Sequence, residues 1–430
     1  MKKNTFIKGT IILLIGTIIS RILGIFIRIA FTRITKEEGI SLLNIIMPTY
    51  VLVVNLTSMG LPLAISIITS KGKYRSKNIF LSIYPFVLLI NFIMMFILII
   101  TSDFISSVLL KSTMVKPLLI AIALTLPFIS ISSILRGIYL GKQKMDKISI
   151  SSSLEQIIRL ILIISILPLL KGKSTVIIVS TYLLFGIVSE LITIIYFLRS
   201  LPNKVKIHKE DLIPNIEIIQ SITSICVPTI SSRLINNILL FLEPIIIMHI
   251  LVFKGLEPPH IRSLYGIFNM YSLSILMIPS FIINTISTSL TPEISKNYQN
   301  KSYIRRRLKQ ILQVTLFISL IFYIVIFLFP KVFLKVLYDT TKGITYIKVL
   351  TPFFILYNLT NPLISTLNGI GKTNIVFKVS LICILVKTII MVIFLFVMPE
   401  INGLVVSEII YIVLNFILLY SYLDRKKLIS

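Results

Sequence analysis

Two arginines lie inside the first long apolar segment of the chain, residues 6–34. Arg21 and Arg28 are seven residues apart, so on a helix they share one face and lie about 10 Å from each other. An arginine near the middle of a membrane helix costs roughly 3 kcal/mol on insertion scales. The positions therefore predict a face that looks into protein or water, and the default interpretation of such residues is a binding or transport pathway.

A third arginine, Arg233, follows two serines in the seventh apolar segment, much as Arg21 follows Ile19 and Ser20. Arginine suits phosphate because its planar donors pair with phosphate oxygens and stay charged when desolvated. We therefore expect a basic cavity that binds an anionic headgroup such as a pyrophosphate. The alternative, which applies above all to Arg28 near the end of its segment, is an arginine that snorkels to an interface or pairs with a carboxylate.

Carboxylates also occur inside the apolar segments. Glu155 and Arg159 have the i, i+4 spacing of an ion pair on one helix face, so they either contact substrate or neutralise each other for packing. Glu190 and Glu243 are candidates for ion coupling, because buried carboxylates can carry protons or cations. For these two the alternative is pairing with a nearby arginine or exposure at a span end.

Long apolar runs recur from one end of the chain to the other. Of the 430 residues 56% are hydrophobic and the mean hydropathy is +0.98, whereas a soluble domain has roughly 45–50% apolar residues. We therefore predict an all-α polytopic membrane protein, with one helix for each run of about 20 apolar residues. The twelve predicted spans are 6–31, 40–69, 79–101, 117–140, 148–170, 174–198, 218–248, 262–290, 307–330, 347–370, 375–398 and 402–423.

The two halves of the chain resemble each other, for example in Pro62 of the second span and Pro279 of the eighth. We predict an N-terminal six-helix lobe (1–200), a cytoplasmic linker (201–216) and a C-terminal six-helix lobe (217–430). Each half has an even number of spans, so the lobes would be parallel repeats related by a pseudo-two-fold axis along the membrane normal. Such pairs hold substrate between the halves and rock to give alternating access.

The net charge of +27 does not indicate nucleic-acid binding, because Lys and Arg lie in short loops between spans. Their distribution follows the positive-inside rule and anionic headgroups, and it places both termini in the cytoplasm of a cell-membrane protein. Cys226 and Cys383 are far apart, and no metal-ligand spacing, nucleotide-binding loop or catalytic set is visible. We expect no cofactor, no metal and no enzymatic activity, with transport driven by membrane potential or by a proton or sodium gradient.

Several short motifs resemble a known family. They are E-E-G-I-S-L-L-N-I-I-M-P-T-Y (37–50), G-L-P-L-A-I-S (60–66), L-R-G-I-Y-L-G-K-Q-K-M (135–145), L-E-Q-I-I-R (154–159), Y-G-I-F-N-M (265–270) and S-L-T-P-E-I-S (289–295). Together they resemble the stage V sporulation protein B group of polysaccharide exporters, in the multidrug/oligosaccharidyl-lipid/polysaccharide flippase superfamily. The resemblance implies two six-helix lobes around a V-shaped cavity and movement of an undecaprenyl-linked sugar between leaflets.

The S-R-I-L-G of residues 20–24 is similar to the start of the first helix in MurJ-type lipid II flippases. In that family arginines of this helix line the central cavity, a role that the resemblance transfers to Arg21 directly and to Arg28 with a spacing that differs by one residue. Many relatives have fourteen spans, and the extra pair is linked to a groove for the lipid tail. With twelve predicted spans, lipid-tail handling stays open here.

We therefore predict an alternating-access flippase that exports an undecaprenyl-linked, lipid II-like precursor of the cell wall or spore cortex. Its partners would be the lipid-linked glycan, membrane lipids and a coupling ion, either proton or sodium, with no nucleic acid. One alternative is a cation-coupled drug antiporter of the same superfamily, which would favour an acidic cavity. The other is a non-transporting scaffold for wall synthesis, for which the arginines inside the spans would be dispensable.

Overall fold

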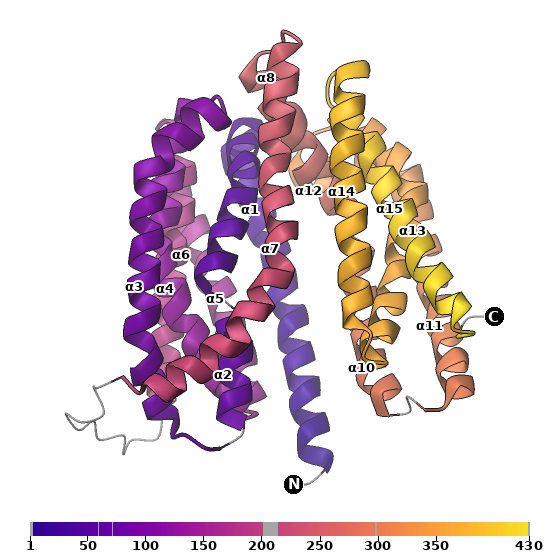
Figure 1. Cartoon of the computed structure of the whole chain (residues 1–430). Helices are drawn as coiled ribbons and strands as arrows, with labels where there is room; N and C mark the ends of the chain where they lie inside the picture. Colours follow the sequence, from indigo (N-terminus) through magenta and orange to yellow (C-terminus); the bar gives the residue numbers. More distant parts are fainter. Residues whose placement is uncertain (1–2, 59, 71, 201–213, 297–298, 429–430) are drawn as a thin grey trace. The chain divides into compact units, whose positions relative to one another are not determined.

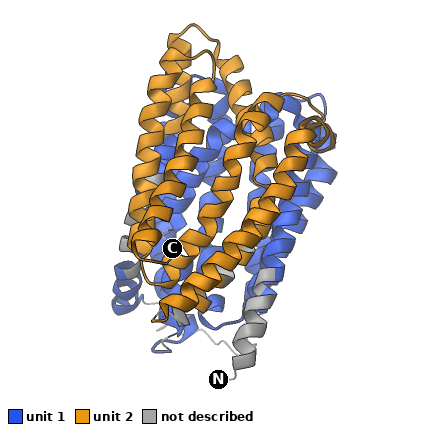
Figure 2. Cartoon of the chain, turned by 90° about the vertical axis from the view of Figure 1, so that its right-hand side faces the viewer, with its two compact units in different colours: residues 1–241 blue, residues 242–430 orange. Residues whose placement is uncertain are grey.

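The computed structural model describes residues 3–58, 60–70, 72–200, 214–296 and 299–428, and the secondary structure of these residues is helical throughout. The chain divides into two compact units, unit 1 (Met1–Phe241) and unit 2 (Leu242–Ser430), which are coloured separately in Figure 2. The boundary falls within one helix, α7. Most of the linker predicted at 201–216 lies outside the described residues, so the predicted lobe boundaries stay a prediction.

Unit 1 contains the helices of the first half of the chain and the first part of α7 (Figure 1). They are α1 (Lys3–Ser58), α2 (Leu61–Ser70), α3 (Ser76–Asp103), η1 (Phe104–Leu109), η2 (Thr113–Val115), α4 (Lys116–Gly141), α5 (Met145–Ile166), η3 (Leu167–Leu170), α6 (Thr175–Arg199) and α7 (Ile216–Phe253). Unit 2 holds the end of α7 and the later elements. They are α8 (Pro258–Gly266), η5 (Ile267–Leu273), α9 (Ser274–Leu276), α10 (Ile278–Lys296), α11 (Lys301–Leu328), α12 (Pro330–Tyr338), α13 (Ile344–Gly369), α14 (Thr373–Val397) and α15 (Asn402–Arg425).

Nine helices of the described part are long and apolar enough to cross a membrane, or ten when the bent pair Pro258–Leu276 and Ile278–Asn284 forms one span. The first of these runs from Ile15 to Ser70 and contains two arms of α1, and α7 adds the shorter apolar helix Asn237–Phe253. The first of these helices overlaps both of the predicted spans 6–31 and 40–69, and the α7 segment overlaps the predicted span 218–248. The prediction of an all-α polytopic membrane protein is confirmed.

Local backbone chemistry explains where the spans bend. Lys36 has a positive φ of 54°, and there α1 changes direction between its two arms. Gly60, with φ of 62°, begins the turn into α2, a conformation that glycine adopts without a steric penalty. In the eighth predicted span the bend is 47°, next to the π-helical segment η5. This span is therefore broken rather than continuous.

The two units repeat the same order of helix partners. In unit 1, α4 packs against α2, α3 and α6, and α5 packs against α6; in unit 2, α13 packs against α10, α11 and α15, and α14 packs against α15. Each unit also ties its central helix to a neighbour by a buried asparagine. Asn91 of α3 accepts a hydrogen bond from Ser130 of α4 at 2.7 Å, and Asn358 of α13 donates to Ser319 of α11 at 3.2 Å. These shared contacts support the internal repeat seen in the sequence.

Candidate functional site

Close packing of α1 on α5 fixes how the first arm of α1 is rotated. Gly16 lies directly against Ser149, and any Cβ at this position would collide with that serine. Ile27 and Phe31, on the same side of the helix, are 4% and 1% exposed. This buried side therefore faces the interior of unit 1 and leaves two other sides of α1 uncovered.

The uncovered sides differ in polarity. At about 100° per residue, Thr17, Arg21 and Arg28 fall within about 40° of one another and form a polar stripe, and all three are exposed. Ile22 and Phe26, 48% and 55% exposed, lie on the far side of the helix from this stripe. The exposed isoleucine and phenylalanine suit hydrocarbon, whereas arginines at the same depth would be costly there. The arginine stripe is thus segregated from the apolar surface of α1.

The side chain of Arg233, the third predicted arginine, lies outside the described residues, although its backbone belongs to α7. Its place in an anion site stays a prediction.

A charged cluster lies inside unit 1, and it begins with the predicted pair on α5. Glu155 accepts from Arg159 Nη2 at 3.5 Å, so the ion pair that their spacing indicates is present. The other carboxylate oxygen of Glu155 accepts from Arg136 Nη2 of α4 at 3.3 Å. The sequence analysis did not single out Arg136, although an arginine within the predicted span 117–140 was a signal that could have found it.

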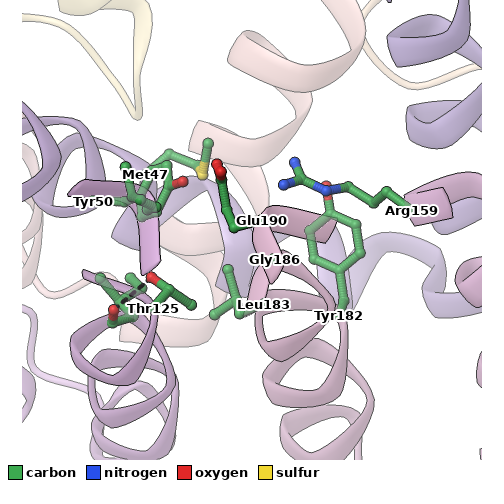
Figure 3. Close-up of a pocket in the computed structure, with 10 residues that line it drawn as sticks. Met47, Tyr50, Thr125, Arg159, Tyr182, Leu183, Gly186 and Glu190 are labelled. Carbon is green, nitrogen blue, oxygen red and sulfur yellow. Dashed lines mark hydrogen bonds between the residues drawn. The ribbon is translucent and has the colours of Figure 1, made fainter. Parts of the chain in front are cut away.

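Glu190 of α6 lies in the same region and is 8% exposed. Its carboxyl and the guanidinium of Arg159 line one cavity, together with Tyr50 of the second arm of α1 and Tyr182 of α6 (Figure 3). Among the described residues, Oε2 of Glu190 and Nε of Arg159 have no hydrogen-bond partner. Buried polar atoms of this kind are normally satisfied by protein or by ordered water, which indicates a hydrated site.

The size of this cavity limits what can enter it. Its volume is about 60 Å³, room for a few water molecules, whereas pockets for organic ligands measure roughly 300–1,000 Å³. Gly186 also lines the cavity, and a Cβ added there would make ordinary van der Waals contacts, at 3.7 Å from Thr125 Cγ2 and 3.8 Å from Arg159 Nη2. Water or a small ion fits beside Arg159 and Glu190, and a sugar headgroup does not. Direct contact of Glu155 and Arg159 with substrate stays a prediction.

A second charged cluster occupies unit 2 and is more tightly paired. Lys387 Nζ of α14 lies 2.9 Å from Glu243 Oε2 of α7 and 2.8 Å from Glu408 Oε2 of α15. The three side chains are 10–12% exposed. Tyr265 of α8 donates to Glu243 Oε1 at 3.1 Å, and the Tyr411 ring centroid lies 5.9 Å from Lys387 Nζ. With every group ionised the cluster carries two negative charges and one positive charge.

The pairing of Glu243 agrees with the alternative considered for it in the sequence, except that the partner is a lysine and not an arginine. Lys387 and Glu408 are 144 and 165 residues away along the chain, so no local spacing links them to Glu243. The packing of α14 on α15 brings Lys387 and Glu408 together, and the ion pair with Lys387 adds Glu243 of α7.

The fold and these charged groups together define a polytopic membrane protein with ionisable residues held inside its helix bundles. Comparison with known families is more specific. Residues 6–298 match the model described as polysaccharide biosynthesis protein, and residues 269–393 match the MatE model. The chain is 30% identical over 400 residues to stage V sporulation protein B of Bacillus subtilis. This alignment covers 90% of this chain and 77% of that protein. The chain belongs to the polysaccharide biosynthesis protein family, in its stage V sporulation protein B-like branch.

Solved structures share the fold at low sequence identity. An inward-facing multidrug resistance MATE family transporter of the MOP superfamily has a TM-score of 0.73 and 15% identity, with 94% of this chain and 95% of that chain covered. The lipid II flippase MurJ in its inward closed conformation has a TM-score of 0.69 and 17% identity, with 96% and 87% covered. The chain therefore shares its fold with these two transporters. The family predicted from the sequence motifs is confirmed by the family-model match and by the similarity to stage V sporulation protein B.

Proposed function

We propose that the protein is a flippase that moves an undecaprenyl-linked, lipid II-like glycan precursor of the cell wall or spore cortex across the cytoplasmic membrane. Membership of the polysaccharide biosynthesis protein family supports a lipid-linked glycan as the substrate class. The similarity in sequence to stage V sporulation protein B and in fold to MurJ supports flipping as the activity. In this proposal both chain termini lie in the cytoplasm, as the distribution of basic loops indicates.

The observation that carries the proposal is the polar stripe of Arg21 and Arg28 on α1. A pyrophosphate group needs cationic donors that stay charged at low dielectric. Two guanidinium groups on the same face of one helix supply them. The apolar side of the same helix, with Ile22 and Phe26, would face acyl chains. One helix can then hold the headgroup on its polar stripe while the lipid tail stays in the bilayer. Arg233 would join these arginines.

We also propose that transport is coupled to protons. In unit 2 the Lys387 ammonium lies between the two carboxylates, where a sodium ion would have to bind, so sodium has no place there without displacing it. One proton on Glu243 or Glu408 would instead cancel the excess negative charge, which is costly inside a membrane. In unit 1, Glu190 beside a cavity that admits water is the second candidate for proton exchange.

A cation-coupled drug antiporter is the second candidate function, because residues 269–393 match the MatE model and a MATE transporter shares the fold. Purified protein in liposomes separates the two functions. A fluorescent undecaprenyl-pyrophosphate-linked sugar should become accessible to an enzyme outside the vesicles, and a proton gradient should speed this. Gradient-driven uptake of a cationic dye, with no movement of the lipid-linked sugar, would favour the antiporter and contradict the flippase.

A further inference from the structure

An apolar groove with a volume of about 280 Å³ runs along unit 2 between α11 and α13. Its lining side chains are almost wholly hydrocarbon. They include Leu320, Ile324, Phe327 and Leu328 of α11 with Pro352 and Ile355 of α13. The groove is distinct from the charged cluster around Lys387, and the flippase mechanism proposed above makes no use of it.

The surface around this groove is suited to contact with hydrocarbon. Phe317, Ile324 and Leu328 of α11 are 66%, 54% and 61% exposed. Such large apolar side chains on an exposed face of a membrane span are stable only against acyl chains or protein. An open apolar groove on this face is suited to the acyl chain of a lipid.

Positive charge gathers at one end of the groove. Lys348 of α13 is exposed and lies one turn before Thr351, on the same helix face as Pro352 and Ile355. It thus extends the α13 wall of the groove toward the membrane surface. Along α13 after this lysine, the wall of the groove becomes apolar within one turn. A boundary between lipid headgroups and acyl chains requires such a change.

Helix α12 adds more charge at the same end. It starts two residues after Leu328, the last groove residue of α11, and packs against both α11 and α13. Its exposed side carries Lys331 and Lys335 beside Val332 and Val336, which are 55% and 61% exposed. A short helix that exposes lysines next to valines fits the headgroup boundary of a membrane.

We propose that this groove binds one acyl chain of an anionic phospholipid, whose phosphate lies against Lys348 and the lysines of α12. The three ammonium groups at a groove lined by hydrocarbon match a ligand that is a phosphate at one end and a chain at the other. The groove opens on the lipid-exposed face of α11, where phospholipids are the abundant ligand. With both termini in the cytoplasm, the site lies in the outer leaflet. The proposal does not depend on the flippase activity.

The chain contains no tryptophan, which allows a single fluorescent reporter in the groove. The Phe327→Trp protein would be reconstituted in phosphatidylcholine vesicles that contain increasing fractions of brominated phosphatidylglycerol or brominated phosphatidylcholine. We expect phosphatidylglycerol to quench at a mole fraction at least about fivefold lower, since each lysine near a phosphate contributes about that factor. Ile393→Trp, 52% exposed near the corresponding end of α14, should show no preference. Equal quenching of Phe327→Trp by the two lipids would overturn the proposal.

The lysines are tested in the same Phe327→Trp protein. Replacing Lys331, Lys335 and Lys348 by Gln should remove the preference for phosphatidylglycerol, whereas Lys309→Gln at the other end of α11 should leave it unchanged. Ile324→Trp in the same groove serves as a second reporter if Phe327→Trp does not fold. Unlabelled phosphatidylglycerol should relieve the quenching. Relief by undecaprenyl phosphate but not by phosphatidylglycerol would overturn the proposal, because the occupant would then be a polyprenyl carrier.

Discussion

The two units bury charge in different ways. In unit 1, Glu155 is shared by two arginines at 3.3 and 3.5 Å, and a cavity with room for water lies beside Arg159 and Glu190. In unit 2, Lys387 contacts two carboxylates at 2.8 and 2.9 Å with side chains only 10–12% exposed. The two units share their helix packing but differ in their charges. Unit 1 has a loosely paired cluster with two cations, and unit 2 has a tightly paired cluster with a single lysine. The comparison suggests that unit 1 tolerates rearrangement of its charges and that unit 2 depends on its lysine.

Removing the lysine of unit 2 should have the largest effect on stability. Lys387→Met leaves Glu243 and Glu408 buried close together without their cation, and such a loss costs about 3–5 kcal/mol. The protein should unfold at a markedly lower Tm in detergent, as measured by differential scanning fluorimetry. Adding Glu243→Gln and Glu408→Gln to this variant should restore most of the lost stability. An unchanged Tm for Lys387→Met alone would show that the cluster is not held by this ammonium.

The corresponding change in unit 1 should cost less. Arg159→Met leaves Glu155 paired with Arg136, and the cavity lets water reach the atoms that lose a partner. We expect a loss of about 1–2 kcal/mol in the free energy of unfolding, measured in the same assay. If Arg159→Met were as damaging as Lys387→Met, the contrast between a loose and a tight cluster would be wrong.

The buried asparagines of the two units also differ in their number of hydrogen-bond partners. Asn358 accepts from Ser280 at 2.7 Å and donates to Ser319 and to Tyr323, at 3.2 and 2.8 Å. Asn91 has one hydrogen bond to another helix among those described, from Ser130. At about 0.6 kcal/mol for each interhelical bond, Asn358→Ala should cost about 2 kcal/mol and Asn91→Ala about 1 kcal/mol or less. Equal losses of Tm would contradict this count of partners.

The smallest expected effect concerns carboxylates near the ends of the spans. Hydrogen bonds from Arg307 and Tyr303 hold the pKa of Glu293 below its ordinary value of 4.5, and Lys73 does the same for Glu217. Because each pKa is lower in the folded state, this stabilisation is present above pH 4.5 and disappears as pH falls through the lowered pKa. Hydrogen-exchange protection factors, which are corrected for the intrinsic pH dependence of exchange, should therefore fall below pH 4.5 at both places, and more at Glu293, whose side chain is 27% exposed against 61% for Glu217. Protection factors that stay constant at both sites as pH falls below 4.5 would contradict these pairings.

Much of the fold could be predicted because a membrane imposes its own length and polarity on each helix. The spans were visible as apolar runs, and the ion pair of Glu155 and Arg159 was visible as an i, i+4 spacing. The short helix α12 was not, because Phe329 and Pro330 continue the apolar run of α11 into it. Nor was the conformation of Lys36 between the two arms of α1, because its positive φ has no signature in residue type.

The candidate sites were less predictable than the fold. Arg21 and Arg28 could be placed on one face from their spacing alone, and the packing of Gly16 on Ser149 then determined which side of α1 they occupy. The meeting of Glu243, Lys387 and Glu408 depends on α7, which is distant in sequence from the consecutive helices α14 and α15. Sequence spacing carries no information about such contacts, so their charges could be noticed but not paired.

The most direct test of the flippase proposal compares three α1 variants in a leaflet-accessibility assay for lipid-linked precursor, in cells depleted of other flippases. Arg21→Ala should abolish export while the protein still inserts at normal levels, Arg21→Lys should keep part of it, and Ile22→Ala on the apolar side should export normally. Full export by Arg21→Ala would contradict the claim that the polar stripe of α1 receives the phosphate headgroup.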